Sequence, residues 1–183
     1  MSASTPWSIK SSATTGTAIS ISGTSTAASD YGVVFNFPVQ KQIIADGGGT
    51  IEINGTGTGS NWGIFCTNTD FLSSSGTITL DGGVNGVKIT DYGSRFGALA
   101  GSDVTSSTAN VVLLGDQITV GDWKSGFSTK VLTSGTVSIQ PYTTSSYGNG
   151  ITWPAGTATS GWNLGKTSGS GSTTFDWETT TVN

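Results

Sequence analysis

A short strand pattern that returns along the chain constrains the fold more than any other feature of the sequence. In residues 76–83, Ile78 and Leu80 alternate with polar residues between flanking glycines, so a strand here has one apolar and one polar face. Related patterns begin roughly 25 to 34 residues apart, at residues 16–23, 49–55, 109–115 and 135–140. An internal repeat of this length is typical of solenoids, propellers and other arrays.

The first two repeats agree over a longer stretch than the strand pattern itself. In each, the patterned strand is followed by a loop of small polar residues. An aromatic residue, a glycine and an apolar run come next, at residues 31–35 and 62–66. This run predicts a second strand in each repeat. No window of the chain has the helical spacing of apolar residues, so we expect no helix.

The repeat predicts an all-β fold, a right-handed parallel β-solenoid of about five to seven coils with strand-like caps at both ends. We expect one domain, in which residues 1–15 form an N-terminal cap, residues 16–165 the repeats, and residues 166–183 a linker and a last strand. Inward side chains of stacked coils should form apolar columns. One predicted column consists of Ile21, Ile53, Leu80 and Ile139.

The composition excludes several classes of function. Charged residues make up only 10% of the chain, the net charge is -4, and no basic cluster exists. We therefore expect no nucleic-acid partner and no binding to anionic membranes. No apolar segment approaches about 18 residues, so we expect no membrane insertion. The chain begins without the features of a signal peptide, and we expect a mature or excised segment that lies outside the cell or at its surface.

Residues that carry catalytic or metal chemistry are sparse. The chain contains one cysteine, Cys66, and no histidine, so it forms no internal disulfide and lacks the usual base for a catalytic thiol. Cys66 lies in an apolar run and is interpreted as a small buried residue. The sequence contains no calcium-loop and no phosphate-loop motif, so we predict no metal site and no cofactor.

Two enzyme hypotheses can be compared with the sequence. A polysaccharide lyase needs a basic residue and nearby carboxylates, for which the candidates are Lys88, Arg95, Asp81 and Asp91. A glycoside hydrolase needs two facing carboxylates, for which the candidates are Asp116 and Asp122. We interpret both sets as loop and turn residues and predict a protein without enzymatic activity.

Tryptophan is abundant, with six residues in the chain. Exposed aromatic rings beside amide side chains often stack on sugar rings, and residues 142–164 combine both kinds of side chain. The predicted glycan-binding residues are Tyr147, Trp153, Trp162 and Asn163. The alternative interpretation is that these rings cover an irregular end of the solenoid.

The runs at residues 77–90, 111–121 and 134–144 resemble the repeats of large bacterial exoproteins of the filamentous-haemagglutinin and autotransporter-passenger type. The resemblance extends over about residues 16–165 and implies a right-handed β-helix displayed outside the cell, often as a stalk within an adhesin. It implies no shared catalytic residues. Pro141 and Pro154 depart from the repeat pattern, which argues against regular stacking near the C-terminal end.

These observations lead to two functional hypotheses. The first is a non-enzymatic, extracellular structural or adhesive segment of a bacterial surface or filament-forming protein. Its terminal strands would pair with another copy or with neighbouring repeats, because the end coils of a solenoid expose unpaired backbone groups. The alternative is a carbohydrate-binding module that holds surface glycans on the tryptophan-rich C-terminal surface.

Overall fold

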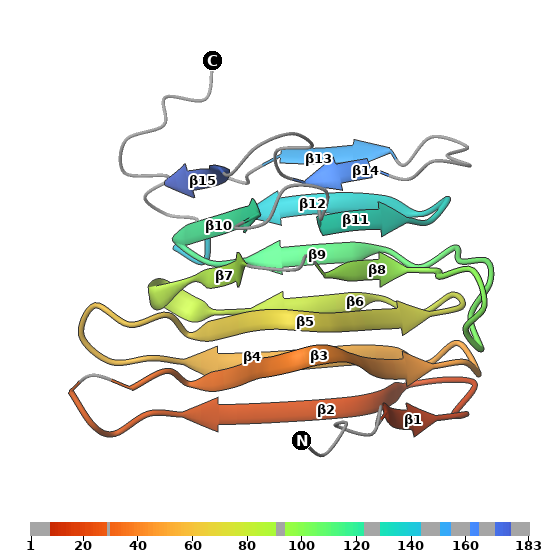
Figure 1. Cartoon of the computed structure of the whole chain (residues 1–183), viewed down its shortest axis with the longest axis horizontal. Coiled ribbons are helices and arrows are strands. Elements are labelled where there is room, and N and C mark those ends of the chain that lie inside the picture. Colours follow the sequence, from red (N-terminus) through yellow and green to blue (C-terminus); the bar gives the residue numbers. More distant parts are fainter. Residues whose placement is uncertain are drawn as a thin grey trace.

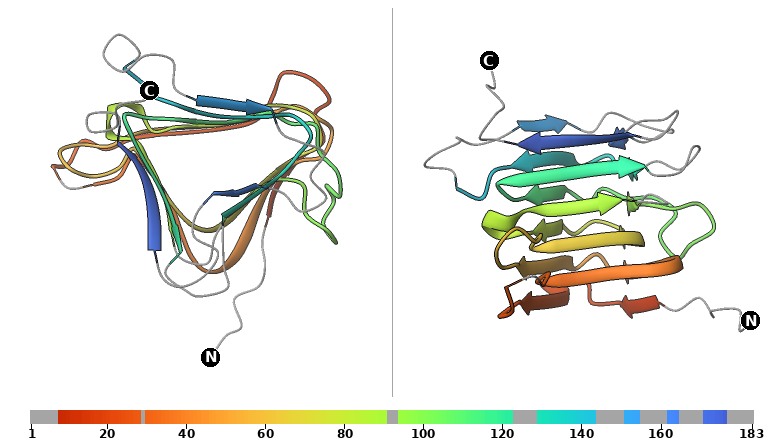
Figure 2. Two further views of the ribbon diagram at one scale, coloured as in Figure 1. Left: turned by 90° about the horizontal axis from the view of Figure 1, so that it is seen from above. Right: turned by 60° about the vertical axis from the view of Figure 1, so that its left-hand side comes forward.

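The chain folds into a stack of parallel coils with a triangular cross-section (Figures 1 and 2). A computed structural model describes residues 8–28, 30–90, 94–122 and 129–143, together with the strands at 151–154, 162–164 and 171–176. The N-terminal coil lies at the bottom of Figure 1 and the C-terminal strands lie at the top. The predicted all-β parallel solenoid is confirmed. Among the described residues, the single helical segment is a 3-10 turn, η1 (Gly83–Asn85).

Three flat faces make up the sides of the triangle. Face 1 contains β2 (Thr17–Thr24), β4 (Thr50–Thr56), β6 (Ile78–Asp81), β9 (Val111–Leu114) and β12 (Thr136–Gln140). Face 2 contains the first halves of β3 (Val33–Ala45) and β5 (Ile64–Ser73), followed by β7 (Val87–Thr90) and β10 (Gln117–Asp122). Face 3 contains β1 (Ser8–Ser11), the second halves of β3 and β5, β8 (Arg95–Gly97) and β11 (Thr129–Leu132). Every one of these neighbouring strands pairs in parallel.

The stack has about four turns, fewer than the five to seven expected from the repeats. Each turn visits face 1, then face 2, then face 3. β1 lies below the first turn and pairs with β3, so the expected N-terminal strand in residues 1–15 is present. β12 lies above the fourth turn and begins a fifth on face 1.

The last three strands reverse the direction of the coil, which explains the lower number of turns. β13 (Ile151–Pro154) pairs antiparallel with β12 on face 1, β14 (Trp162–Leu164) with β11 on face 3, and β15 (Gly171–Asp176) with β10 on face 2. The chain thus passes the faces in the order 1, 3, 2, opposite to every coil below. The segment expected as a fifth parallel repeat is instead a counter-wound coil that covers the last strand of each face. Pro141 follows β12 directly, where the regular pattern ends.

Inward side chains form continuous apolar columns along the stack. The predicted column on face 1 is confirmed by the strand register, which adds Leu113 to it: the order is Ile21, Ile53, Leu80, Leu113 and Ile139. On face 3, Phe71 stacks on Phe96 of the coil above, at 5.3 Å between ring centroids, and it meets the ring of Phe35 from face 2 edge-on, at 5.8 Å. Residues in the middle coils of these columns are completely buried. This burial of apolar surface is the main stabilising contribution to a chain that has few charges.

Cys66 lies inside this core, as predicted for a small buried residue. Its side chain is fully buried and forms no disulfide, and burial raises the pKa of its thiol well above the usual range. Because the thiolate is the reactive form, a thiol with a raised pKa is chemically inert in the folded state.

Glycines occupy the corner between faces 1 and 2 because successive backbones approach too closely for any side chain. A Cβ atom at Gly63 would lie 2.0 Å from the carbonyl oxygen of Gly82, and one at Gly55 would lie 2.0 Å from that of Gly63. The equivalent glycines in the lowest coil, Gly23 and Gly32, meet backbone atoms in the same way. This explains why the Gly-flanked strand pattern repeats in the sequence.

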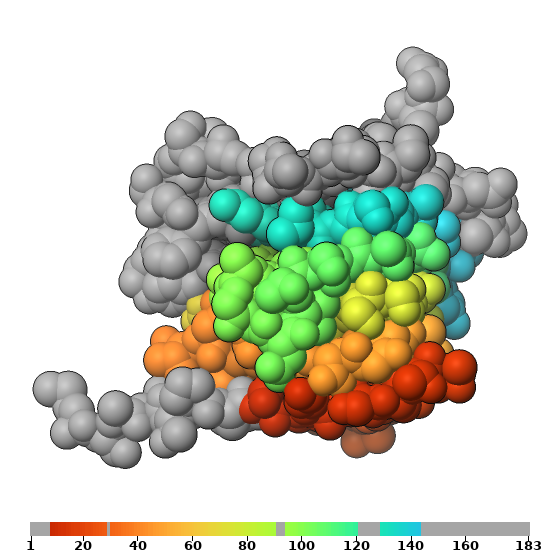
Figure 3. All heavy atoms as spheres, turned by 90° about the vertical axis from the view of Figure 1, so that its right-hand side faces the viewer, coloured from red at the N-terminus to blue at the C-terminus, as the bar shows by residue number. Residues whose placement is uncertain are grey.

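The connection between β8 and β9, residues 98–110, covers part of face 3. It stands out in green in Figure 3. Val104 and Ala98 pack there against Ile44 and Leu72, which point outward from β3 and β5, and the four side chains form a second small core. Lys10 of β1 is anchored nearby, with its Nζ 2.8 Å from Asp46 and 3.0 Å from Asp103. Part of the outer surface of face 3 is therefore covered by the chain itself.

Candidate functional site

The outer surface of face 2 carries a cluster of aromatic and aliphatic side chains, which we call the aromatic patch. It consists of Tyr31, Val34, Trp62, Phe65 and Lys88. Val34, Phe65 and Lys88 are direct neighbours on β3, β5 and β7. Tyr31 and Trp62 lie at the preceding corner, each two residues before the paired positions Val33 and Ile64.

Strand alternation explains why these residues point outward. Val33 and Phe35 are buried in the core, so Val34 between them faces solvent and is 48% exposed. In the next coil, Ile64 and Cys66 are buried and Phe65 between them is partly exposed. The local sequence therefore has apolar residues on both faces of the strand, although only one face is needed for the core.

The rings of the patch contact one another and a cation. Tyr31 and Phe65 are 5.1 Å apart between ring centroids and inclined by 31°. The Nζ of Lys88 lies 5.6 Å from the centroid of the Trp62 ring, within the range of a cation–π interaction. Tyr31 is 36% exposed, and Trp62 is partly exposed. The patch is accessible to a ligand from solvent.

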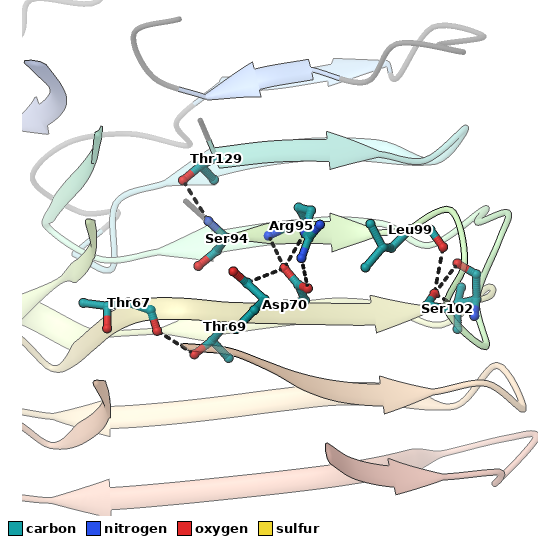
Figure 4. Close-up of polar contacts among 10 residues, drawn as sticks. Thr67, Thr69, Asp70, Ser94, Arg95, Leu99, Ser102 and Thr129 are labelled. Carbon is teal, nitrogen blue, oxygen red and sulfur yellow. Dashed lines mark hydrogen bonds and ion pairs between the residues drawn. The ribbon is translucent and has the colours of Figure 1, made fainter. Parts of the chain in front are cut away.

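A polar cluster, separate from the aromatic patch, lies at the corner between faces 2 and 3 and is shown in Figure 4. The carboxylate of Asp70 on β5 accepts hydrogen bonds from Arg95 Nε at 2.8 Å and from the Arg95 backbone N–H at 3.1 Å. Gln40 of the coil below donates to the same carboxylate at 2.7 Å. Asp70 has no exposed surface, and burial raises its pKa, with the Arg95 guanidinium opposing that effect. The cluster joins three successive coils, and its carboxylate is closed to solvent while the Arg95 side chain is partly exposed.

The enzyme candidates from the sequence lie apart in the structure. Lys88 lies on face 2, and Arg95 on face 3 is bound to Asp70. Asp81 on face 1 accepts a hydrogen bond from the Gly83 backbone N–H at 2.9 Å, and burial raises its pKa. Asp91 lies outside the described residues. These three described candidates of the lyase hypothesis are thus distributed over three faces.

The pair considered for a glycoside hydrolase also has no common site in the described structure. Asp116 accepts hydrogen bonds from the backbone N–H of Thr143, at 2.7 Å, and from its hydroxyl, which holds the turn after β12 against the corner below. The side chain of Asp122 lies outside the described residues. In the described part of the chain, no group of three or more His, Cys, Asp and Glu side chains could hold a metal ion.

The predicted glycan-binding residues of the C-terminal segment are described only in part. Tyr147 lies outside the described residues. Trp153 belongs to β13 on face 1, whereas Trp162 and Asn163 belong to β14 on face 3, and the side chains of all three lie outside the described part. Their strands therefore lie on different sides of the triangle.

Sequence reasoning missed the aromatic patch, although its signal was visible. The matching runs at residues 31–35 and 62–66 predict strands, and both also contain an aromatic residue at the corner and an apolar residue at the outward position. Stacking the two repeats in register would have placed these side chains together.

The two ends of the solenoid differ in how their backbone groups are satisfied. At the C-terminal end, the short antiparallel strands β13, β14 and β15 cover all three faces. At the N-terminal end, β2 is an edge strand of eight residues, and its pairing among the described strands is with β4 alone. The first half of β3 likewise pairs upward with β5.

Comparison with known proteins returned no match to a family model, to a curated protein or to a solved structure. No helix in the described residues has the length and apolar character needed to cross a membrane.

Proposed function

We propose that this chain is a non-enzymatic structural segment of an extracellular or surface-displayed β-solenoid protein, joined to a second copy through its N-terminal coil. The observation that carries the proposal is the difference between the two ends. A solenoid end with free parallel edges is a template for strand addition, whereas short edge strands protect against it. The few charged residues and the hydroxyl-rich surface support a structural role outside the cell.

Among the described residues, every second backbone position of β2 has no strand partner on the side of the open end. The N–H of Thr50 donates to Gly16 in the coil below, while the N–H of Ile51 donates to Thr77 in the coil above. In a parallel ladder this alternation continues along each strand. By the register of β2 on β4, Ser20 and Ser22 direct their N–H and C=O groups away from β4, toward the open end.

The core of the lowest coil is covered less completely than the core above it. Ile19, Val33 and Phe35 are 7%, 7% and 6% exposed, whereas Ile51, Ile64 and Cys66 directly above them have no exposed surface. A further coil from a second copy would cover these side chains and pair the free edges of β2 and β3 at the same time. Both effects favour association.

Light scattering and electron microscopy on the purified chain test this proposal, with Ser20→Pro as the variant. Proline removes the N–H that faces the open end and is tolerated on an edge strand. We expect the wild-type chain to form dimers through its N-terminal end, and the variant to be monomeric with the same β-rich circular dichroism spectrum. Ser20→Thr, which keeps the N–H, is the matched control. A wild-type chain that stays monomeric at high concentration would contradict the proposal.

Glycan binding by the C-terminal residues Trp153 and Trp162 stays a prediction. Their side chains lie outside the described structure, so no geometry of that surface supports it.

A further inference from the structure

We propose that the aromatic patch on face 2 binds a sugar ring that carries a carboxylate, as in a uronic or sialic acid residue of a glycan. The patch lies on the outward side of β3, β5 and β7, whereas association at the N-terminal end would use the downward backbone edges of β2 and β3. The proposal is therefore independent of association through that end. It also concerns residues other than the C-terminal tryptophans considered from the sequence.

The aromatic patch differs from the outer surface of face 1 in the first three coils. On face 1, the corresponding outward residues of the first three coils are Ser20, Glu52 and Thr79, which are polar. On face 2, the equivalent row begins with Val34 and Phe65 and continues to Lys88. These outward side chains do not contribute to the interior of the coil, so core packing does not explain them.

The size of the patch favours a small ligand over a folded protein. Five side chains extend over three coils, a height of about 10 Å at the spacing of neighbouring strands. A stable protein interface buries about 800 Å² on each partner and involves about 20 to 30 residues per side. The patch falls far short of that number, but it matches one or two sugar rings of an oligosaccharide.

The chemistry of the patch matches the two kinds of surface on a pyranose ring. The apolar C–H face of a sugar packs against an aromatic ring, which Trp62 and Tyr31 provide. The hydroxyl groups around the ring edge need hydrogen-bonding partners. Asn61 precedes Trp62 in the sequence, and Asn85 precedes Val87 by two residues, as Trp62 precedes Ile64, the register partner of Val87. The amide of Asn85 is held by donating to the carbonyl oxygen of Gly59 at 3.0 Å.

The position of Lys88 favours a carboxylate on the sugar. Its Nζ lies over the Trp62 ring and forms no salt bridge with another described residue. The other cations with described contacts, Lys10 and Arg95, are each paired with a carboxylate of the chain. A sugar stacked on Trp62 therefore brings its carboxylate within reach of a cation that has no acidic partner among the described residues. Asp30 directly precedes Tyr31 in the sequence and lies in the lowest coil. Lys88 lies on β7, at the opposite edge of the patch.

Titrations with matched acidic and neutral sugars test the proposal. The probes are oligogalacturonate with the corresponding neutral galactose oligomer, and sialyllactose with lactose, followed by tryptophan fluorescence and calorimetry. We expect the wild-type chain to bind at least one acidic probe about fivefold or more tightly than its neutral counterpart. A preference within the first pair of probes identifies a uronic acid as the ligand, and a preference within the second pair identifies a sialic acid.

Two variants and two matched controls assign the binding to the patch. Trp62→Ala should weaken binding of both sugars of the pair about tenfold or more, and Lys88→Gln should remove the preference for the acidic sugar. The controls are Tyr142→Ala, another exposed aromatic residue, and Lys130→Gln, an exposed lysine on face 3, and both should bind as the wild type does. Circular dichroism checks that each variant is folded.

The proposal is overturned if no acidic probe binds, if neutral and acidic sugars bind equally, or if the controls lose as much affinity as the patch variants. The Ser20→Pro variant separates this result from the proposed assembly. As a folded monomer it should bind the acidic sugar with wild-type affinity, so either proposal can fail without the other.

Discussion

The guanidinium of Arg95 holds the fully buried carboxylate of Asp70 in the coil below, with Nη2 2.7 Å from Oδ2 and Nε 2.8 Å from Oδ1. The two residues lie one coil apart, at the corner where face 2 turns into face 3 (Figure 4). Asp70 also accepts from Gln40, so the carboxylate joins three coils. A buried charge of this kind is tolerated only while it is paired.

Replacing Arg95 with Met should destabilise the protein more at pH 7 than at pH 4. Burial already raises the pKa of Asp70, so the folded state holds the carboxyl proton more tightly than the unfolded chain does. Protonation of Asp70 therefore stabilises the folded state fully below the unfolded pKa of about 3.9. This contribution to the free energy of unfolding is lost as the pH rises through the folded pKa. Without Arg95 the folded pKa rises further, and the loss at pH 7 should reach about 3 kcal/mol.

Urea unfolding at the two pH values measures this difference. The double variant with Asp70→Asn is the control, because it removes the titrating group and should lose the pH dependence. Equal destabilisation of Arg95→Met at both pH values would show that Asp70 carries no buried charge.

Leu80→Ala should cost about 2–5 kcal/mol in the free energy of unfolding, because it leaves a cavity in the middle of the face 1 column. Ile21→Ala, in the same column but in the lowest coil, should cost clearly less. Leu80 is fully buried, whereas Ile21 is partly exposed at the open end. Denaturant melts of the two variants compare them directly. Similar losses would mean that the lowest coil is packed as completely as the middle ones.

Gly63→Ala should unfold the protein or disrupt the corner between faces 1 and 2. The added Cβ would meet the carbonyl oxygens of Gly82 and Gly55 at 2.0 and 2.4 Å, and these backbone atoms are held by the stack above and below. Gly101→Ala is the control, since that residue has a φ of 79° but open space around it. Its cost should be limited to about 1–2 kcal/mol for the left-handed backbone. Thermal melts of both variants measure the contrast.

Cys66 should resist thiol reagents in the folded protein and react in urea. Its side chain is completely buried, and its raised pKa leaves almost no thiolate near neutral pH. The rate of labelling by a disulfide reagent, with and without denaturant, measures this accessibility. Rapid labelling under native conditions would show that the first half of β5 opens readily.

The sequence alone was sufficient to predict the solenoid and one of its columns. Alternation in the strand around Ile78 and its return along the chain predict stacked coils, because a repeated unit with one apolar face buries a continuous core when its copies stack. The column through Ile53 and Leu80 follows from aligning the repeats, and the buried position of Cys66 follows from its apolar run. These properties are local or nearly periodic, so they can be read from the order of residues.

Only the tertiary structure decided the direction of the last coil, the aromatic patch and the Asp70–Arg95 pair. A period of two is the same in parallel and antiparallel strands, so residues 151–154 gave no sign that they would pair backwards with β12. The patch and the ion pair depend on which residues of successive coils become neighbours across loops of unequal length. Packing of the whole stack sets that register. The sequence pattern does not reveal it, because the strands that become neighbours are distant in sequence.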